Sequence, residues 1–297
     1  MFKSINDIAI RGIAACVPEE VVKSTDTEFI KYTGIEQRRV SDYSASDLCY
    51  VAGRQLLKDL GWTDVDYLVF VSQTPDYQLP SSSCILQDHL GLSEETACFD
   101  ISLSCSGWVY GLNVIASLGG RGLLLVGDTL SQICDKNDSA TYPLFSDCGT
   151  ATAVESKKGS GMKFHLGTKG SGHENIIKRG EFMEMNGVGV FMFVINKVPK
   201  SIKLLMLKNN ITDVDYYVFH QSNKSMIEGV CNKLKIDKSK VPMSLKDFGN
   251  TSSASIPLTL LTNNIQGNII ACGYGAGLSW GSVYLKLNCI YSKLIEL

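Results

Sequence analysis

The sequence predicts an α/β fold made of two copies of one unit. The segment 63–70 (TDVDYLVF) recurs at 212–219 (TDVDYYVF) with seven of eight residues identical, at a shift of 149 residues in a chain of 297. A shift of half the chain length indicates a duplication. Strand-like and helix-like segments alternate in both copies, which is typical of mostly parallel sheets covered by helices. Two fused copies imply a layer of helices between two sheets.

The first half is expected to span residues 1–156. Residues 46–60 carry apolar side chains at helical spacing and are followed by Gly61, so they predict an amphipathic helix. The other elements expected here are strands at Tyr67–Ser72, Phe99–Ser102, Gly122–Gly127 and Ala151–Glu155, a helix that opens at Pro80–Ser83 and ends near Leu90, and a helix at Ser106–Leu118.

The second half is expected to span residues 157–297. Glycines are frequent in 159–187, which predicts one flexible segment that serves as a lid or a linker. The other elements expected here are strands at Met162–Leu166, Tyr216–Phe219, Asn268–Cys272 and Leu278–Leu287, and helices at Val190–Lys208, 223–234 and 253–264.

Composition excludes several classes of protein. The formal net charge is -2 and no Lys/Arg run exceeds two residues, which argues against a nucleic-acid or membrane-surface partner. No apolar run approaches the length of a membrane span. Charged residues interrupt the first apolar stretch, which a signal peptide would not tolerate. The ten cysteines form no C-x-x-C pair and have no histidine at zinc-finger spacing, so we expect no metal site, and we expect buried thiols in the cytoplasm.

His220 is the leading candidate for a catalytic residue. It follows the repeated strand, at the point where the first copy has only Val71 and Ser72. Open α/β sheets place reactive groups at the carboxyl ends of their strands. A lone histidine after an apolar strand is often a satisfied core residue, so this assignment needs partners.

Two further segments supply them. Cys105 stands between a strand and the start of an apolar helix, where backbone N–H groups and the helix dipole are expected to lower the pKa of a thiol. Asn250 precedes a Ser/Thr-rich helix start. At the repeat shift, Cys105 aligns near 252–254, so Cys105 and Asn250 head equivalent helices, with His220 expected between them.

These segments resemble the β-ketoacyl-ACP synthase III family of the thiolase superfamily. The resemblance lies in DISLSCSGWVYGL (100–112), VFHQSN (218–223), FGNTSSASIP (248–257) and GYGAGLSWGS (273–282), with shorter matches at 33–39, 127–128 and 145–147. It covers the whole chain in order, and it implies a thiolase-like five-layer αβαβα fold.

The resemblance also implies a two-stage mechanism. Cys105 takes an acyl group from an acyl-CoA or acyl-ACP thioester, with the backbone N–H groups of Cys105 and Gly275 as the oxyanion hole. His220 and Asn250 then stabilise the enolate formed when malonyl-ACP loses CO2, and condensation gives a 3-oxoacyl product. The substrates are thioesters and no cofactor is implied.

Several positions depart from the family pattern. Phe29 and Ser139 stand at or near the places of a Trp and an Arg that hold the coenzyme A adenine, and Ser225 and Met192 stand where an Arg and a Lys contact the carrier protein. These departures favour a diverged enzyme of a secondary or polysaccharide-linked pathway over the enzyme that starts fatty acid biosynthesis.

Family members are homodimers in which a loop of the partner subunit closes the acyl pocket. The matching loop is 76–80, and Leu79 takes the place of a large aromatic residue. Leu79 and Phe145 are therefore expected to line the substrate pocket, and the smaller Leu79 predicts a primer longer or more branched than acetyl.

Two alternatives stay open. A non-decarboxylating acyltransferase would use the same Cys105 without the enolate step, and a non-catalytic partner subunit would need no nucleophile at all. Intact His220 and Asn250 favour the condensing enzyme over the first, and the presence of Cys105 argues against the second. The hydroxymethylglutaryl-CoA synthase branch of the superfamily needs an acidic residue directly after the 67–72 strand. This chain has Gln-Thr-Pro at 73–75, which argues against membership of that branch.

Overall fold

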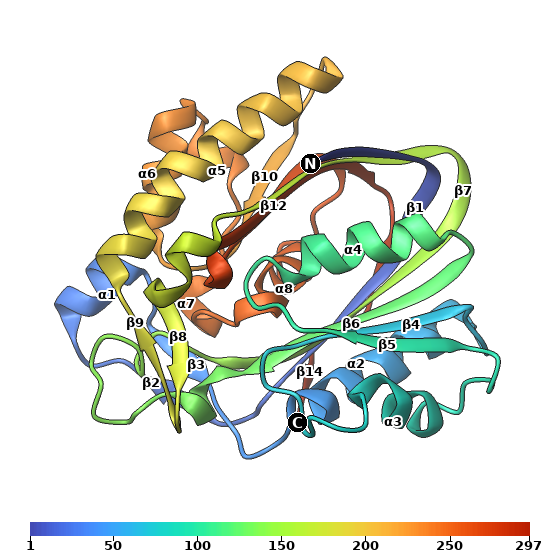
Figure 1. Ribbon diagram of the computed structural model, residues 1–297, viewed down its shortest axis with the longest axis horizontal. Coiled ribbons are helices and arrows are strands. Elements are labelled where there is room, and N and C mark those ends of the chain that lie inside the picture. The colour runs from blue at the N-terminus through green and yellow to red at the C-terminus, as the bar shows by residue number, and fades with distance from the viewer.

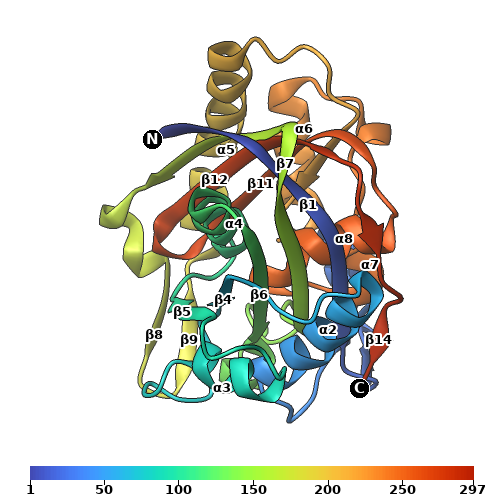
Figure 2. The same ribbon diagram turned by 90° about the vertical axis from the view of Figure 1, so that its right-hand side faces the viewer.

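The computed structural model describes residues 1–297, in which one ten-stranded sheet, continuous through its two halves, folds around a central pair of helices (Figures 1 and 2). The strands of the first half are β4 (Tyr67–Val71), β5 (Ala97–Ile101) and β6 (Arg121–Thr129), and those of the second half are β10 (Tyr216–Phe219), β11 (Gly267–Gly275) and β12 (Ser279–Leu287). Two long strands, β1 (Phe2–Val17) and β7 (Asp147–Thr168), run through both halves. The duplicated fold expected from the sequence is present.

Helices cover both outer faces and fill the middle. In the middle lie α4 (Gly107–Leu118) and α8 (Ser255–Thr262), outside the first half lie α2 (Ala45–Leu60) and α3 (Ser82–His89), and outside the second half lie α5 (Gly187–Asn209) and α6 (Lys224–Leu234). The three largest groups of buried apolar residues match these positions. One surrounds α4 and α8, one lies under α2, and one lies under α5 and α6. This is the five-layer arrangement expected from the resemblance.

The repeat is visible in strand pairing. The order in the first half is β5-β4-β6-β7-β1, and in the second half β10-β11-β12-β7-β1. In each half the repeated strand pairs in parallel with the next one inward, β4 with β6 and β10 with β11, and the following pair is antiparallel. The second half lacks a counterpart of β5, because residues 245–248 form the short helix α7 (Leu245–Phe248) instead.

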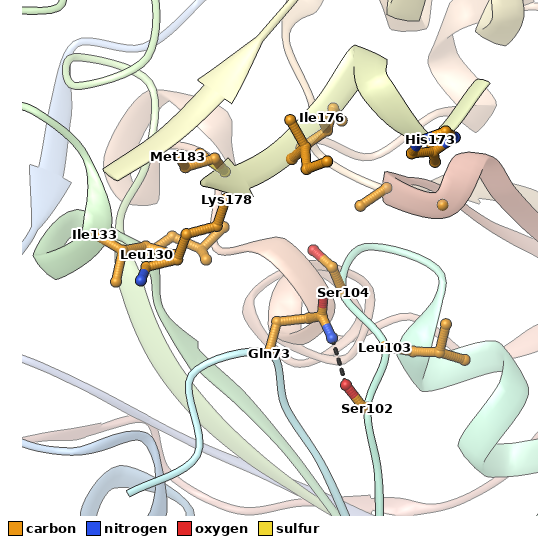
Figure 3. Close-up of a pocket in the computed structure, with 13 residues that line it drawn as sticks. Gln73, Ser102, Leu103, Ser104, Leu130, Ile133, His173, Ile176, Lys178 and Met183 are labelled. Carbon is orange, nitrogen blue, oxygen red and sulfur yellow. Dashed lines mark hydrogen bonds between the residues drawn. The ribbon is translucent and has the colours of Figure 1, made fainter. Parts of the chain in front are cut away.

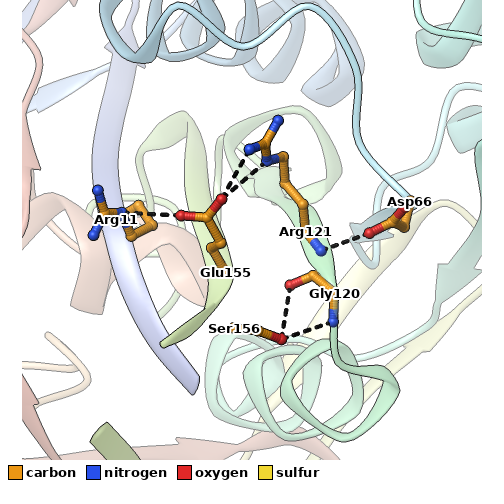
Figure 4. A network of polar contacts seen from close by, with 6 residues as sticks. All are labelled: Arg11, Asp66, Gly120, Arg121, Glu155 and Ser156. Carbon is orange, nitrogen blue, oxygen red and sulfur yellow. Dashed lines mark hydrogen bonds and ion pairs between the residues drawn. The ribbon is translucent and has the colours of Figure 1, made fainter. Parts of the chain in front are cut away.

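The repeated Asp side chains perform the same task in both halves. Asp66 accepts the N–H of Arg121 at 2.7 Å at the start of β6, as Figure 4 shows, and Asp215 accepts the N–H of Asn268 at 2.7 Å at the start of β11. In each half the residue that donates the N–H follows a glycine with positive φ, Gly120 or Gly267. The residues that the two copies share therefore maintain strand pairing at the start of the strands. The copies differ at the opposite ends of the strands.

One expectation, on residues 159–187, needs correction. Residues 159–187 are not one flexible segment, because they contain the end of β7, a short turn of helix, and the hairpin β8 (Ile176–Arg179) and β9 (Phe182–Met185). The division of the chain between residues 156 and 157 stays a prediction, and β7 runs across this position. No helix in the structure has the length and apolarity needed to cross a membrane.

The remaining elements are short. They are β2 (Val21–Lys23), α1 (Thr27–Thr33), β3 (Gln37–Arg39), β13 (Ile290–Tyr291) and β14 (Ile295–Glu296), with 3-10 turns at Leu130–Ile133, Gly170–Asn175, Lys238–Lys240, Ser252–Ala254 and Ala276–Leu278. Of these, the turn at Ser252–Ala254 contributes most to the site.

Candidate active site

The ends of three elements bring the predicted catalytic residues together. Cys105 follows β5 and precedes α4, His220 follows β10, and Asn250 lies between α7 and the turn that leads into α8. All three line one cavity, together with Phe145 and Gly275. The cavity is narrow, with room of about 40 Å³ for water-sized molecules. One residue from the first half therefore faces two from the second, as the repeat predicted.

Glycine backbone approaches Cys105 closely. A Cβ added to Gly275 would lie 2.7 Å from Cβ and 2.9 Å from Sγ of Cys105, and one added to Gly273 would lie 2.7 Å from the Cys105 carbonyl oxygen. Only glycine permits this contact between β11 and the turn that carries the cysteine. The main chain of Gly275 therefore lies next to the sulfur, where an oxyanion-hole donor is needed.

The protonation of Cys105 differs from the sequence-based expectation. Burial raises the pKa of its thiol, with a small further increase from Asp128, while the hydroxyls of Ser104 and Ser252 lower it. The Sγ atom lies 3.4 Å from Ser104 Oγ and 3.8 Å from Ser252 Oγ. The backbone at the helix start lowers the thiol pKa as predicted, but the net direction is upward because removal from water outweighs all of these donors.

His220 is a buried neutral imidazole. Burial lowers its pKa to about 3, an effect that the backbone of Ser252 partly offsets. Its Nδ1 lies 2.7 Å from Ser255 Oγ, and the ring of Tyr274 meets it edge-on with centroids 5.3 Å apart. The Tyr274 hydroxyl also donates to the His220 carbonyl oxygen at 3.1 Å. These contacts fix both the ring and the main chain of His220.

Asn250 presents a hydrogen-bond donor to the cavity. Its Oδ1 accepts the N–H of Ser252 at 3.0 Å, and this hydrogen bond orients the side-chain amide. Its main chain is held by the N–H of Ser146 and the carbonyl oxygen of Leu144, both at 3.0 Å, so residues from the first half anchor it. The amide Nδ2 has no protein partner and is not sealed from the cavity. An amide with its oxygen occupied offers only its N–H groups.

Ser252 connects the three residues and was missed from the sequence. It has a φ of +50°, in the left-handed region that a serine rarely adopts, and its hydroxyl lies 2.9 Å from Ser104 Oγ. Such strain is commonest at functional sites. The only signal in the sequence is the density of hydroxyl residues in 251–255, which is also typical of a helix start.

Asp128 holds the neighbouring turn in place. One carboxylate oxygen accepts the N–H of Gln73 at 2.7 Å, and the other accepts both the N–H and the hydroxyl of Ser253. It is fully buried, and burial raises its pKa. Asp128 therefore ties the end of β4 in the first half to the turn before α8 in the second.

A second cavity of about 410 Å³ adjoins the first (Figure 3). It reaches Ser104 and Gly277, close neighbours in sequence of Cys105 and Gly275, and the β8–β9 hairpin covers it. Ile176 lines both cavities. Leu79 lines neither cavity of its own chain, and its side chain is 87% exposed. Phe145 lies in the narrow cavity, as expected for a pocket residue.

The positions that depart from the family pattern also have structural explanations. Phe29 packs against the apolar residues under α5 and α6, and Ser139 is exposed. Ser225 donates its hydroxyl to the carbonyl oxygen of Tyr32 at 2.7 Å, and Met192 is exposed.

Known proteins with this arrangement share both sequence and fold with the chain. Residues 99–170 match the family described as 3-oxoacyl-[acyl-carrier-protein (ACP)] synthase III, and residues 207–287 match its C-terminal part. The β-ketoacyl-[acyl-carrier-protein] synthase III of Geobacillus kaustophilus is 34% identical over 93% of this chain and 98% of its own. The chain belongs to the 3-oxoacyl-[acyl-carrier-protein] synthase III family.

Solved structures of synthase III proteins agree with this assignment. The 3-oxoacyl-(acyl-carrier protein) synthase of Burkholderia xenovorans LB400 has a TM-score of 0.92 and 32% identity, covering 98% of this chain and 99% of that one. The synthase III of Pseudomonas aeruginosa PAO1 has a TM-score of 0.88 and 27% identity, covering 98% and 100%. The thiolase-like fold and the acyltransferase class expected from the resemblance are confirmed.

Proposed function

We propose that this synthase III family member is a decarboxylating condensing enzyme that joins an acyl group on Cys105 to a malonyl thioester. The observation that carries this proposal is the donor on Asn250, which faces the cavity because its oxygen is held by Ser252. Simple acyl transfer forms no enolate, so it does not require a hydrogen-bond donor beside His220. Decarboxylation places negative charge on a thioester oxygen, which two neutral donors in a dry cavity would stabilise.

In the first stage, Cys105 Sγ attacks the acyl thioester. The carbonyl oxygen of the tetrahedral intermediate is bound by the N–H groups of Cys105 and Gly275. The new S–C bond replaces the old one, and the departing thiolate takes up the proton that the cysteine loses. Because burial raises the thiol pKa, the free enzyme holds a protonated cysteine, so proton transfer accompanies the attack.

In the second stage, the thioester oxygen of the malonyl substrate accepts hydrogen bonds from His220 and Asn250. We assign the proton of His220 to Nε2, because Ser255 Oγ accepts the N–H of Gln221 at 3.3 Å and is free to donate to Nδ1. The carboxylate leaves as CO2 and its electron pair forms the enolate. The enolate carbon attacks acyl-Cys105 and the S–C bond breaks, which gives a 3-oxoacyl thioester. Cys105 leaves as a thiolate and takes up a proton from water, which restores the thiol of the free enzyme. No cofactor is required.

The acyl group is proposed to occupy the 410 Å³ cavity, closed by Leu79 of a second copy of the chain. Support comes from the exposure of Leu79 and from β5, which is an edge strand with half-buried side chains. Edge strands that expose apolar residues commonly pair with another chain. Asp100 of β5 accepts the N–H groups of Ser82 and Ser83, at 2.7 and 2.9 Å, and so fixes the loop that carries Leu79.

The proposals on the malonyl donor and on the pathway rest on the positions at which the chain departs from the family pattern. With Phe29 packed on the core and Ser139 exposed, the chain offers no pair of side chains to hold an adenine, which favours a carrier-bound thioester. The proposed role lies in a secondary or polysaccharide-linked pathway. Ten cysteines without a disulfide support a cytoplasmic location.

The test separates the two stages in one pair of variants. Asn250→Asp keeps the shape of the side chain but replaces the amide donor with an acceptor. Acylation of Cys105, measured as a mass increment on its peptide, should persist, while release of CO2 from malonyl thioester should fall by a factor of about 100 or more. Asn196→Asp changes an exposed asparagine of α5 to the same residue and controls for charge.

Two outcomes would overturn the proposal. Unchanged condensation in Asn250→Asp would favour the non-decarboxylating acyltransferase. An acyl adduct on another cysteine would remove Cys105 as nucleophile. No adduct in wild type, with intact binding of thioester, would favour a non-catalytic subunit. Cys105→Ala should abolish the adduct.

A further inference from the structure

Two hydroxyl groups form a closed triangle with the thiol of Cys105. Ser104 Oγ lies 3.4 Å from Cys105 Sγ and 2.9 Å from Ser252 Oγ, and Ser252 Oγ lies 3.8 Å from the same sulfur. All three side chains are buried. The hydroxyl of Ser104 has no other hydrogen-bond partner in the protein, so its contacts are confined to this triangle.

The direction of these hydrogen bonds depends on the charge of the sulfur. A neutral thiol can donate to a hydroxyl, whereas a thiolate can only accept. The hydroxyl of Ser104 is the nearer of the two, so it donates to a thiolate at Cys105, and its own oxygen then accepts from Ser252. Hydrogen bonds in such a chain polarise and strengthen one another. Negative charge on the sulfur is thus stabilised by two hydroxyls in series.

The charged and titratable groups near Cys105 offer no substitute for these hydroxyls. Asp128 raises the pKa of the thiol further. His220 is neutral, and the hydroxyl of Tyr274 donates to the main chain of His220 rather than to the sulfur. No lysine or arginine lines the narrow cavity. The two hydroxyls are therefore the side-chain groups that favour a thiolate at this buried position.

Ser104 lies where the two cavities adjoin. Cys105 lines the narrow cavity, and Ser104 lines the larger one together with Gln73 and Ser102 (Figure 3). Gln73 donates its side-chain N–H to the hydroxyl of Ser102 at 2.7 Å and leaves Ser104 free to bind the sulfur. The residue that contacts the sulfur is therefore part of the wall of the proposed acyl cavity.

We infer that Ser104 is a further catalytic residue, whose hydroxyl donates a hydrogen bond to Cys105 Sγ whenever the sulfur carries negative charge. The inference rests on the proposed function, because it requires Cys105 as the nucleophile. In acylation, the hydrogen bond stabilises the charge that develops as the thiol proton departs. In condensation, the S–C bond breaks with its electron pair on Sγ, and Ser104 stabilises the leaving thiolate while it keeps its own proton. Water then protonates the sulfur.

The residue on the other side of Cys105 provides a matched control. The hydroxyl of Ser106 lies 2.7 Å from Ser279 Oγ and makes no hydrogen bond with the sulfur. Ser279 also donates to the carbonyl oxygen of Ala276 at 2.8 Å, so it keeps a partner when Ser106 is replaced. Ser106→Ala therefore removes a buried hydroxyl next to the same cysteine without changing the contacts of Sγ.

The experiment measures the reactivity of Cys105 with iodoacetamide, which requires no acyl substrate. Mass spectrometry of the Cys105 peptide gives the rate of alkylation as a function of pH. In Ser104→Ala the midpoint of this profile should rise by about one pH unit, and the rate at neutral pH should fall about tenfold. In Ser106→Ala the rate should stay within about twofold of the wild-type rate.

A second pair of variants separates the hydroxyl from the shape of the side chain. Ser104→Thr keeps the hydroxyl, and Ser104→Val removes it while occupying nearly the same volume. Thermal unfolding checks that both proteins fold, and the Thr variant should be alkylated about tenfold faster than the Val variant. Equal rates in this pair, or a wild-type profile in Ser104→Ala, would overturn the inference.

The enzymatic reaction distinguishes this inference from the proposed function. Acylation by an acyl thioester and condensation with a malonyl thioester should both fall about tenfold in Ser104→Ala, because both stages place charge on the sulfur. A shifted alkylation profile in a protein whose wild type never releases CO2 would refute the proposed function alone. Slower condensation with an unchanged alkylation profile would restrict Ser104 to the cavity wall and overturn its role at the sulfur.

Discussion

Replacement of Gly275 by alanine tests the closest contact in the site. Its added Cβ would lie 2.7 Å from Cβ of Cys105, whereas ordinary contacts begin at 3.4 Å, so the two groups must separate by about 0.7 Å. Neither side has room, because Cys105 is buried and β11 is paired with both neighbours. The nucleophile and the oxyanion-hole donor would move apart.

The expected loss in acylation is a factor of about 100 to 1,000, the range for an oxyanion-hole donor or a displacement near 1 Å. The assay is the rate of mass increment on the Cys105 peptide with an acyl thioester, with thermal unfolding as a check on folding. Gly170→Ala is the control, since an added Cβ there meets nothing within 4 Å. A Gly275→Ala protein that folds and acylates at the wild-type rate would refute the assignment of Gly275 to the oxyanion hole.

Three further predictions concern the imidazole, the acyl pocket and pH. Ser255→Ala removes the hydrogen-bond partner of His220 Nδ1, so the rate of CO2 release should fall about tenfold while the rate of Cys105 acylation is retained. An equal loss of CO2 release and of acylation would indicate misfolding. Leu79→Phe should shift the primer preference toward shorter acyl groups in a thioester competition, whereas a monomeric wild type would exclude this role. Burial raises the pKa of Asp147 to about 6, so its neutral form is favoured in the folded state. As the pH rises from 4 to 6, the free energy of unfolding of the wild type should therefore decline by about 3 kcal/mol relative to that of Asp147→Asn. Parallel curves of unfolding free energy against pH for the two proteins would contradict this.

The sequence predicted most of the elements, and it predicted that Cys105, His220 and Asn250 lie around one cavity. The repeat placed His220 at a strand end, and the repeat shift placed Cys105 and Asn250 at matching positions, because a duplicated unit returns equivalent strand ends to the same edge. The strand and helix limits of the structure lie within a few residues of the expected ones in most elements. Local periodicity and turn residues determine such features.

What the sequence did not reveal depends on distant contacts. The left-handed backbone of Ser252 leaves no pattern in the residue types, and its closeness to Cys105 arises from elements 147 residues apart. The direction of the Cys105 pKa shift was misjudged because a helix start is visible in sequence while burial is not. Similarly, the β8–β9 hairpin lies in a glycine-rich stretch that lacks a strong strand signal.

The shared strands β1 and β7 also determine how the molecule comes apart. Each pairs with the other along most of its length, and β7 continues from β6 in one half to β12 in the other, with Asp7 accepting the N–H of Gly159 at the bend. Neither half can leave without exposing a broken sheet edge. The protein should therefore unfold in one cooperative transition, and a gene divided near this bend should yield two fragments that regain activity only when they are refolded together. We therefore expect each half of the duplicated chain to be stable only when it is paired with the other.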